Sequence, residues 1–187
     1  PLETRFNVAA FGLLGYECNL CEMKKEELDA IRTQISNYKE WREVFQFVTF
    51  YRGRTFDGEI SALRNGDGNL TEWTCVSKDK SRAVGAIVQK MVVPNTAYQY
   101  YQAKGLESHQ KYHFYNQALK YNIKNFGGLV NMIAPIHIKQ DSVIHNVAAK
   151  LVKLDGEIEE YHVYGGVLMH NGVRLKQAFA GTGYNNE

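Results

Sequence analysis

The stretch that most limits the fold is a short apolar run near the start of the chain, Val8-Ala9-Ala10-Phe11, closed by Gly12 and Gly15. Apolar and small residues without alternation are typical of a strand that is covered on both faces, as in a parallel sheet. Such a strand cannot fold alone, and no strand is predicted before it. The run therefore predicts an inner strand whose neighbours lie elsewhere.

A long amphipathic helix is predicted next, from Lys24 to about Val48. Glu26 and Glu27 stand in its first turn, where the helix dipole favours carboxylates. A buried strand followed by a helix is the repeating unit of α/β barrels, so the pair is interpreted as the last strand–helix unit of a barrel. Apolar residues recur at steps of three and four, which indicates one packed face: Leu28, Ile31, Ile35, Tyr38, Trp41 or Arg42, Phe45 and Val48.

From about Phe56 the helical period is lost and short strands alternate with turn residues. Residues 73–77 and 83–93 predict a hairpin around a polar loop. A second hairpin is predicted over 168–175, because Asn171-Gly172 suits the positive φ angles of a type I′ turn. Many short strands at close spacing predict an antiparallel β-sandwich.

Three stretches resemble glycoside hydrolase family 36, the microbial α-galactosidases. Leu2-x-x-Arg5 followed by residues 8–17 is similar to the final barrel strand of that family. Residues 122–139 and 165–184 are similar to its C-terminal domain. The resemblance covers nearly the whole chain, in order.

The resemblance implies a mostly β chain in two parts. Residues 1–52 would be the end of a catalytic (β/α)8 barrel, its last strand and helix. Residues 53–187 would form a C-terminal antiparallel β-sandwich that is truncated at its end. The chain begins at Pro1 without an initiator Met, and we expect it to be a fragment of a larger enzyme.

The family resemblance also implies an activity: retaining hydrolysis of terminal, non-reducing α-galactosides such as melibiose and raffinose. Two Asp residues on middle barrel strands would carry it, the nucleophile within Lys-x-Asp-x-Asn. Lys139-x-Asp141 and Lys153-x-Asp155 begin in this way, but neither is completed by Asn, and both lie among turn or loop residues. No catalytic residue is therefore predicted in this chain, and the pair is expected upstream of Pro1. No sugar-binding residue is predicted.

The cysteines Cys18, Cys21 and Cys75 are odd in number, which does not fit a disulfide framework. Cys18-x-x-Cys21 lacks both the βαβ context of a redox pair and the second ligand pair of a zinc site. The resembling family tends to carry Leu and Asp at positions 18 and 19. Reduced structural thiols are predicted, with no metal and no cofactor, in a cytoplasmic compartment.

Histidines and tyrosines were the other candidate site residues. The six His show no metal-binding spacing, and His137 and His145 are interpreted as hydrogen-bonded residues of strand-like stretches. Five tyrosines could form an aromatic platform for sugar rings, although aromatic residues also fill sheet faces, which is the favoured interpretation: Tyr98, Tyr100, Tyr101, Tyr112 and Tyr115.

The composition excludes some partners. A net charge of +2 is too small to favour nucleic acid or an anionic membrane, and no apolar run approaches the about 20 residues of a membrane span. Two functions stay open: the C-terminal portion of an α-galactosidase, for which the resemblance implies a homo-oligomer, commonly a tetramer, and an independent β-sandwich module that binds carbohydrate or acts as a scaffold. The strand–helix unit over residues 6–48 favours the first.

Overall fold

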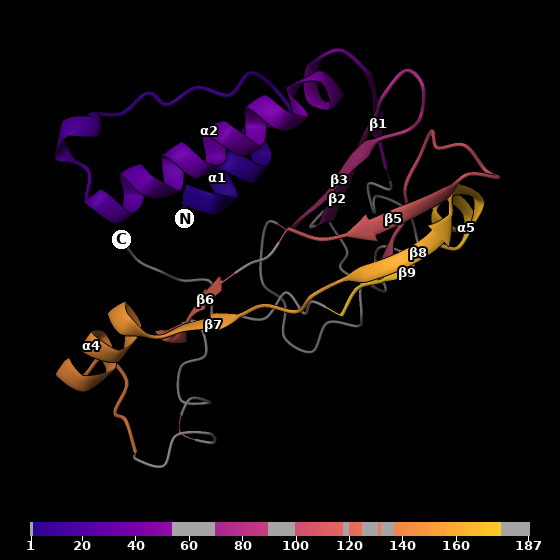
Figure 1. Cartoon of the computed structure of the whole chain (residues 1–187). Helices are drawn as coiled ribbons and strands as arrows, with labels where there is room; N and C mark the ends of the chain where they lie inside the picture. Colours follow the sequence, from indigo (N-terminus) through magenta and orange to yellow (C-terminus); the bar gives the residue numbers. More distant parts are fainter. Residues whose placement is uncertain are drawn as a thin grey trace.

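The computed structural model describes residues 2–53, 70–89, 100–117, 120–124, 131 and 137–176 (Figure 1). The chain begins with a helix, α1 (Leu2–Ala9), followed by a short 3-10 turn, η1 (Leu20–Glu22), and a long helix, α2 (Lys25–Gln46). Among the described residues, strands, two short helices and the segments that connect them follow α2.

The predicted strand at residues 8–11 is wrong, because α1 runs to Ala9 and a turn follows it. None of the described strands pairs with this segment. A strand without ladder partners leaves its N–H and C=O groups unpaired, whereas a helix satisfies them internally. Phe6 and Ala10, four residues apart, are both buried against Tyr38 of α2. The apolar run is thus buried on one side of a helix end and not on two faces of a strand.

The helix predicted from Lys24 to about Val48 is confirmed as α2, with bounds at Lys25 and Gln46. Lys24 precedes it, and the Lys24 N–H donates to the Glu27 carboxylate at 2.9 Å, which supports the first turn. Every apolar position of the predicted stripe is buried or half-buried, and Trp41 rather than Arg42 faces inward.

An antiparallel sheet follows α2, with the order β1-β2-β3. Its strands are β1 (Thr49–Arg52), β2 (Leu70–Val76) and β3 (Ala83–Gln89). The predicted hairpin is confirmed: Val76 pairs with Ala83 across the turn, and Leu70 with Gln89 at the far end. The predicted residues 90–93 lie outside the described part of the chain.

The remaining described strands form three two-stranded antiparallel ribbons. They are β4 (Tyr100–Tyr101) with β9 (Val173–Arg174), β5 (Lys111–Tyr115) with β8 (Glu160–Tyr164), and β6 (Lys120–Asn122) with β7 (Lys153–Asp155). Helix α4 (Val143–Leu151) precedes β7, and α5 (Gly165–His170) follows β8. Within the described residues the strands are antiparallel, as predicted, but they do not close into a sandwich of two sheets.

The second predicted hairpin is wrong, since residues 165–170 are helical and Val173 pairs with Tyr101 instead. Gly172 does adopt a positive φ, 73°, and its N–H donates to the Val167 carbonyl at 2.9 Å. This is the left-handed residue that ends many helices. Asn171-Gly172 therefore terminates α5 and does not form a hairpin turn.

One apolar core joins the sheet to the ribbons. Its buried members come from β2, β4, the following loop, α5 and β9: Val76, Tyr101, Ala103, Leu106, Leu168 and Val173. The inward side chains of β5 and β8 pack against this cluster. In Figure 1 the β5–β8 ribbon and α5 lie beside the three-stranded sheet, while α4 projects from the β6–β7 ribbon.

Candidate functional site

Both rejected aspartates are exposed side chains on the β6–β7 and α4 region. Asp155 ends β7 with its side chain 82% exposed, and Lys120 lies 3.7 Å away as an ion partner. Asp141 stands in the turn before α4 with a φ of 59°, and its N–H donates to Nδ1 of His145 at 3.2 Å. Glycoside cleavage uses carboxylates in a water-excluded pocket, where their charge acts strongly on the transition state. Asp141 and Asp155 are open to water and lack that setting.

His145 lies on α4 and not in a strand-like stretch, so that part of its interpretation is wrong. Its side chain is 2% exposed, and Ser142 caps the helix by accepting the His145 N–H. Nδ1 accepts the Asp141 N–H, whereas Nε2 makes no hydrogen bond. His137 is exposed and lies in an irregular stretch.

The three cysteines are free thiols in two different environments. Cys18 and Cys21 are exposed, and Cys18 precedes the 3-10 turn whereas Cys21 lies within it. The Asn19 side chain accepts the Cys21 N–H at 3.1 Å. Cys75 is fully buried in β2, and burial raises the pKa of its thiol to about 11. Across the described ranges, no group of three His, Cys, Asp or Glu side chains is arranged to hold a metal ion.

The tyrosines do not assemble into one platform. Tyr101 is a core residue whose hydroxyl lies 2.8 Å from the Thr74 hydroxyl, and Tyr112 packs against the same core. Tyr100 and Tyr115 are exposed, but they stand on separate ribbons. Tyr98 lies outside the described residues. The packing of Tyr101 and Tyr112 fits the interpretation as sheet-packing residues, whereas Tyr100 and Tyr115 are exposed on separate ribbons.

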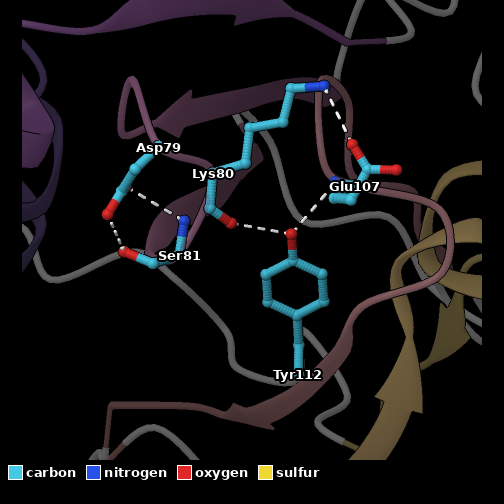
Figure 2. A network of polar contacts seen from close by, with 5 residues as sticks. All are labelled: Asp79, Lys80, Ser81, Glu107 and Tyr112. Carbon is cyan, nitrogen blue, oxygen red and sulfur yellow. Dashed lines mark hydrogen bonds and ion pairs between the residues drawn. The ribbon is translucent and has the colours of Figure 1, made fainter.

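A network of polar contacts closes the β2–β3 turn (Figure 2). The Asp79 carboxylate accepts the Ser77 hydroxyl at 2.6 Å, the Ser81 hydroxyl at 2.8 Å and the Ser81 N–H at 3.1 Å. Because these donors, Ser77 first, stabilise the charged carboxylate, the pKa of Asp79 falls to about 2.

The same turn is tied to the loop before β5. The Tyr112 hydroxyl donates to the Lys80 carbonyl at 2.7 Å and accepts the Glu107 N–H at 3.0 Å (Figure 2). Lys80 also forms an ion pair with Glu107 at 3.3 Å, between two half-exposed side chains. Each of these polar groups is paired with another group of the β2–β3 turn or of the loop before β5. This pairing indicates that the network has a structural role.

Glu159 is a buried carboxylate that the sequence reasoning missed. It is fully buried, and it accepts hydrogen bonds from the Tyr161 hydroxyl at 2.8 Å and from the Lys176 N–H. The bond to Glu159 raises the pKa of Tyr161, because it favours the neutral phenol. Strand alternation was the available signal, since Glu159, Tyr161 and Val163 fall on one face.

A shallow depression opens beside Glu159. The donors to Glu159 come from β8 and from the segment after β9, so the carboxylate fastens the two together. The depression is lined by Glu157, Tyr161, Val173, Arg174, Leu175 and Lys176.

Comparison with known proteins identifies the family. Residues 70–184 match the glycosyl hydrolase family 36 C-terminal domain, and residues 1–48 match the melibiase family. The chain therefore belongs to glycosyl hydrolase family 36, as the resemblance implied. The two matches follow the same order as the two predicted parts.

Curated relatives agree with this family. The chain is similar to the α-galactosidase AgaA of Geobacillus stearothermophilus, with 34% identity over 111 residues, which is 59% of this chain and 14% of that protein. It is also similar to the α-galactosidase Mel36A of Lactobacillus acidophilus, with 38% identity over 91 residues, or 49% of this chain and 11% of that protein. The chain thus spans a small part of the curated relatives that it matches.

Solved structures match nearly the whole chain. An α-galactosidase from Lactobacillus brevis aligns with a TM-score of 0.65 and 28% identity, over 98% of this chain and 18% of that one. AgaA aligns with a TM-score of 0.61 and 24% identity, over 97% of this chain and 18% of that one.

Across the described residues, no helix is both long and apolar enough to cross a membrane.

Proposed function

We propose that this chain is the C-terminal portion of a retaining α-galactosidase that hydrolyses terminal, non-reducing α-galactosides. The observation that carries the proposal is the order of the two family matches, the melibiase end first and the family 36 C-terminal domain second. The curated relatives are named α-galactosidases, and AgaA variants have been solved in complex with raffinose and with stachyose.

We infer a division of the chain at residues 1–52 and 53–187. The first part would complete the catalytic barrel, and the second would form an antiparallel sandwich that braces it. The catalytic carboxylates would lie outside this chain, on strands preceding Pro1. The exposed positions of Asp141 and Asp155 support this, because neither lies in a water-excluded pocket.

An enzyme assay tests the proposal directly. The isolated chain should hydrolyse no aryl α-galactoside above the buffer rate, and Asp141→Asn with Asp155→Asn should change nothing. The same chain extended at its N-terminus by the coding sequence before Pro1 should be active, because the carboxylate pair acts as a unit. Activity of the isolated chain that disappears in the double variant would overturn the proposal.

An independent sugar-binding module is the alternative. It predicts saturable binding of galactose or raffinose by the isolated chain, whereas the proposed enzyme fragment should bind neither, since its sugar site would lie in the barrel. A titration followed by calorimetry separates the two. Tyr115→Ala serves as the matched variant, because Tyr115 is the exposed aromatic of β5.

The proposal extends to assembly and compartment. The complete enzyme would be a homo-oligomer, and three free thiols suit a reducing, cytoplasmic compartment. Gel filtration of the extended chain with light scattering would check the assembly.

A further inference from the structure

The outer face of the β5–β8 ribbon carries two histidines that lie directly opposite each other. Strands β5 and β8 run antiparallel beside each other (Figure 1), and His113 of β5 pairs with His162 of β8 in their register. The next residues along the two strands, Phe114 after His113 and Tyr161 before His162, turn inward and pack on the core. Side chains alternate along a strand, so the outer face holds every second residue: Lys111, His113, Tyr115, Glu160, His162 and Tyr164.

The backbone brings this histidine pair especially close. Gly165 N–H donates to the Gln110 carbonyl at one end of the ribbon, and Asn116 N–H donates to the Glu159 carbonyl at the other. Hydrogen-bonded and non-hydrogen-bonded pairs alternate, and the His113–His162 pair lies three steps from each of these. It is therefore a non-hydrogen-bonded pair, the kind with the shorter Cα separation. The two ring centroids lie 4.7 Å apart, with the planes 17° from parallel.

A carboxylate adjoins the pair on the same face. Nε2 of His113 lies 3.2 Å from Oε1 of Glu160, and the Glu160 side chain is 65% exposed. Metal-binding histidines commonly donate a hydrogen bond from the ring nitrogen that does not bind the metal to a carboxylate, which orients the ring and raises its basicity. Glu160 can act in this way, or it can turn to ligate the ion itself.

We propose that His113 and His162 form a two-imidazole site for a borderline divalent ion such as Zn²⁺, Ni²⁺ or Cu²⁺, with Glu160 as the adjoining carboxylate. Imidazole nitrogen suits these ions, whereas Mg²⁺ and Ca²⁺ prefer oxygen. In the part of the chain that the structure describes, no three ligands already surround one point. Binding therefore requires both rings to turn edge-on toward the ion, and both side chains are exposed and free of the core.

The site goes beyond the proposed hydrolysis and does not depend on it. Lys111 stands on the same face, two residues from His113, and its charge opposes a cation. The imidazoles must be neutral to bind, so acid should release the ion as protons compete.

Nickel titration of the 187-residue chain, without an added histidine tag, tests the site. A background carrying Cys18→Ser and Cys21→Ser removes the exposed thiols, which also bind such ions. Calorimetry should give one equivalent of Ni²⁺, and the paramagnetic ion should broaden the NMR signals of the His113 and His162 rings first. Broadening centred on another histidine would overturn the proposal.

Substitutions complete the test. Glu160→Gln should weaken Ni²⁺ binding about 10- to 100-fold, the usual cost of losing a ligand's partner, and His162→Ala should weaken it more. His109→Ala and His170→Ala are matched controls, because both histidines are exposed and neither faces another histidine across a strand pair. They should leave affinity unchanged. Unaltered affinity in His162→Ala, with the circular dichroism of the parent chain, would refute the site.

Discussion

Tyr101 packs closely against the backbone of β3 in the described core. Its ring lies over β3, and a Cβ built on Gly85 would stand 1.9 Å from the Tyr101 hydroxyl oxygen and 2.2 Å from the carbon that carries it. The hydroxyl meets Thr74 at 2.8 Å, and Thr74 is the strand partner of Gly85. Glycine at position 85 therefore leaves the space in which the phenol reaches β2, and burial raises the pKa of that phenol well above its ordinary value.

Replacing Gly85 by Ala should destabilise the chain by about 1–3 kcal/mol, the usual cost of overpacking a core. The reason is that the methyl group and the Tyr101 ring cannot occupy the same place. Urea midpoints measure the effect. Gly15→Ala is the control, because a Cβ at Gly15 meets nothing within 4 Å; equal midpoints for the two variants would contradict the packing.

Thiol reactivity should separate Cys75 from the other cysteines. At pH 8 an aromatic disulfide reagent should modify Cys18 and Cys21 at once and Cys75 only after unfolding, since Cys75 is buried with a raised pKa. The folded pKa of about 11 exceeds the ordinary 9.0, so Cys75 contributes stability that is full below pH 9 and is lost as the pH rises through 11. Three thiols reacting at one rate in the native chain would contradict this.

At the scale of elements, the sequence predicted secondary structure correctly where the local pattern determines it. It failed where contacts with residues distant in sequence determine it. Helix α2 was predictable because its stripe spans 22 residues, so packing and period agree. The four-residue run at Val8–Phe11 fits a buried strand or a helix end equally well. Asn171-Gly172 was ambiguous too, because a type I′ turn and a helix end both need a positive φ at glycine.

The β2–β3 turn should keep its hydrogen bonds into strong acid. The folded pKa of Asp79, about 2, lies below its ordinary 3.8, so its contribution is full above pH 3.8 and is lost as the pH falls through 2. The exchange rate of the Ser81 amide, which donates to Asp79, reports this. Above pH 3.8 the Ser81 amide should exchange faster in Asp79→Asn than in the wild type, and this difference should shrink as the pH falls through 2. Equal exchange rates of the Ser81 amide in the two proteins at neutral pH would contradict the assignment.

At the scale of the molecule, the candidate sites depend on partners far apart in sequence. His113 lies opposite His162 because β5 and β8 pair in one register. The contact between His113 and Glu160 spans 47 residues of sequence, and no local pattern specifies such a pairing. The absence of a catalytic pair from this chain and the position of that pair upstream of Pro1 both remain predictions. Glu159 could have been found from alternation, but its Lys176 partner could not.

Two apolar clusters, rather than one, hold the described residues. One contains Phe6, Ala10 and Tyr38 on α1 and α2, and the other is the core of the strands and α5. Among the contacts between the two regions, Arg82 of the sheet lies 3.9 Å from the Trp41 ring and 3.9 Å from Glu40. These exposed contacts are worth about 1 kcal/mol or less each. The Phe11 ring, in the turn after α1, also lies 5.4 Å from the Trp73 ring and 6.4 Å from the Phe50 ring, centroid to centroid, and such aromatic pairs add about 0.5–1.5 kcal/mol each. The clusters are thus joined by a few ring and surface contacts and share no buried member.

Hydrogen exchange should therefore show α1 opening before the sheet. Amides of residues 8–14 should exchange through local opening, whereas those of β2, which is paired on both edges, should require global unfolding. Phe6→Ala removes a buried ring, a change that costs about 3–5 kcal/mol in a well-packed core, and should abolish protection in α1. Protection at Thr74 and Cys75 should stay the same in that variant. If residues 8–14 are the best-protected amides of a monomer, or if Phe6→Ala lowers protection equally in α1 and β2, the chain unfolds as one unit and the two-cluster description is wrong.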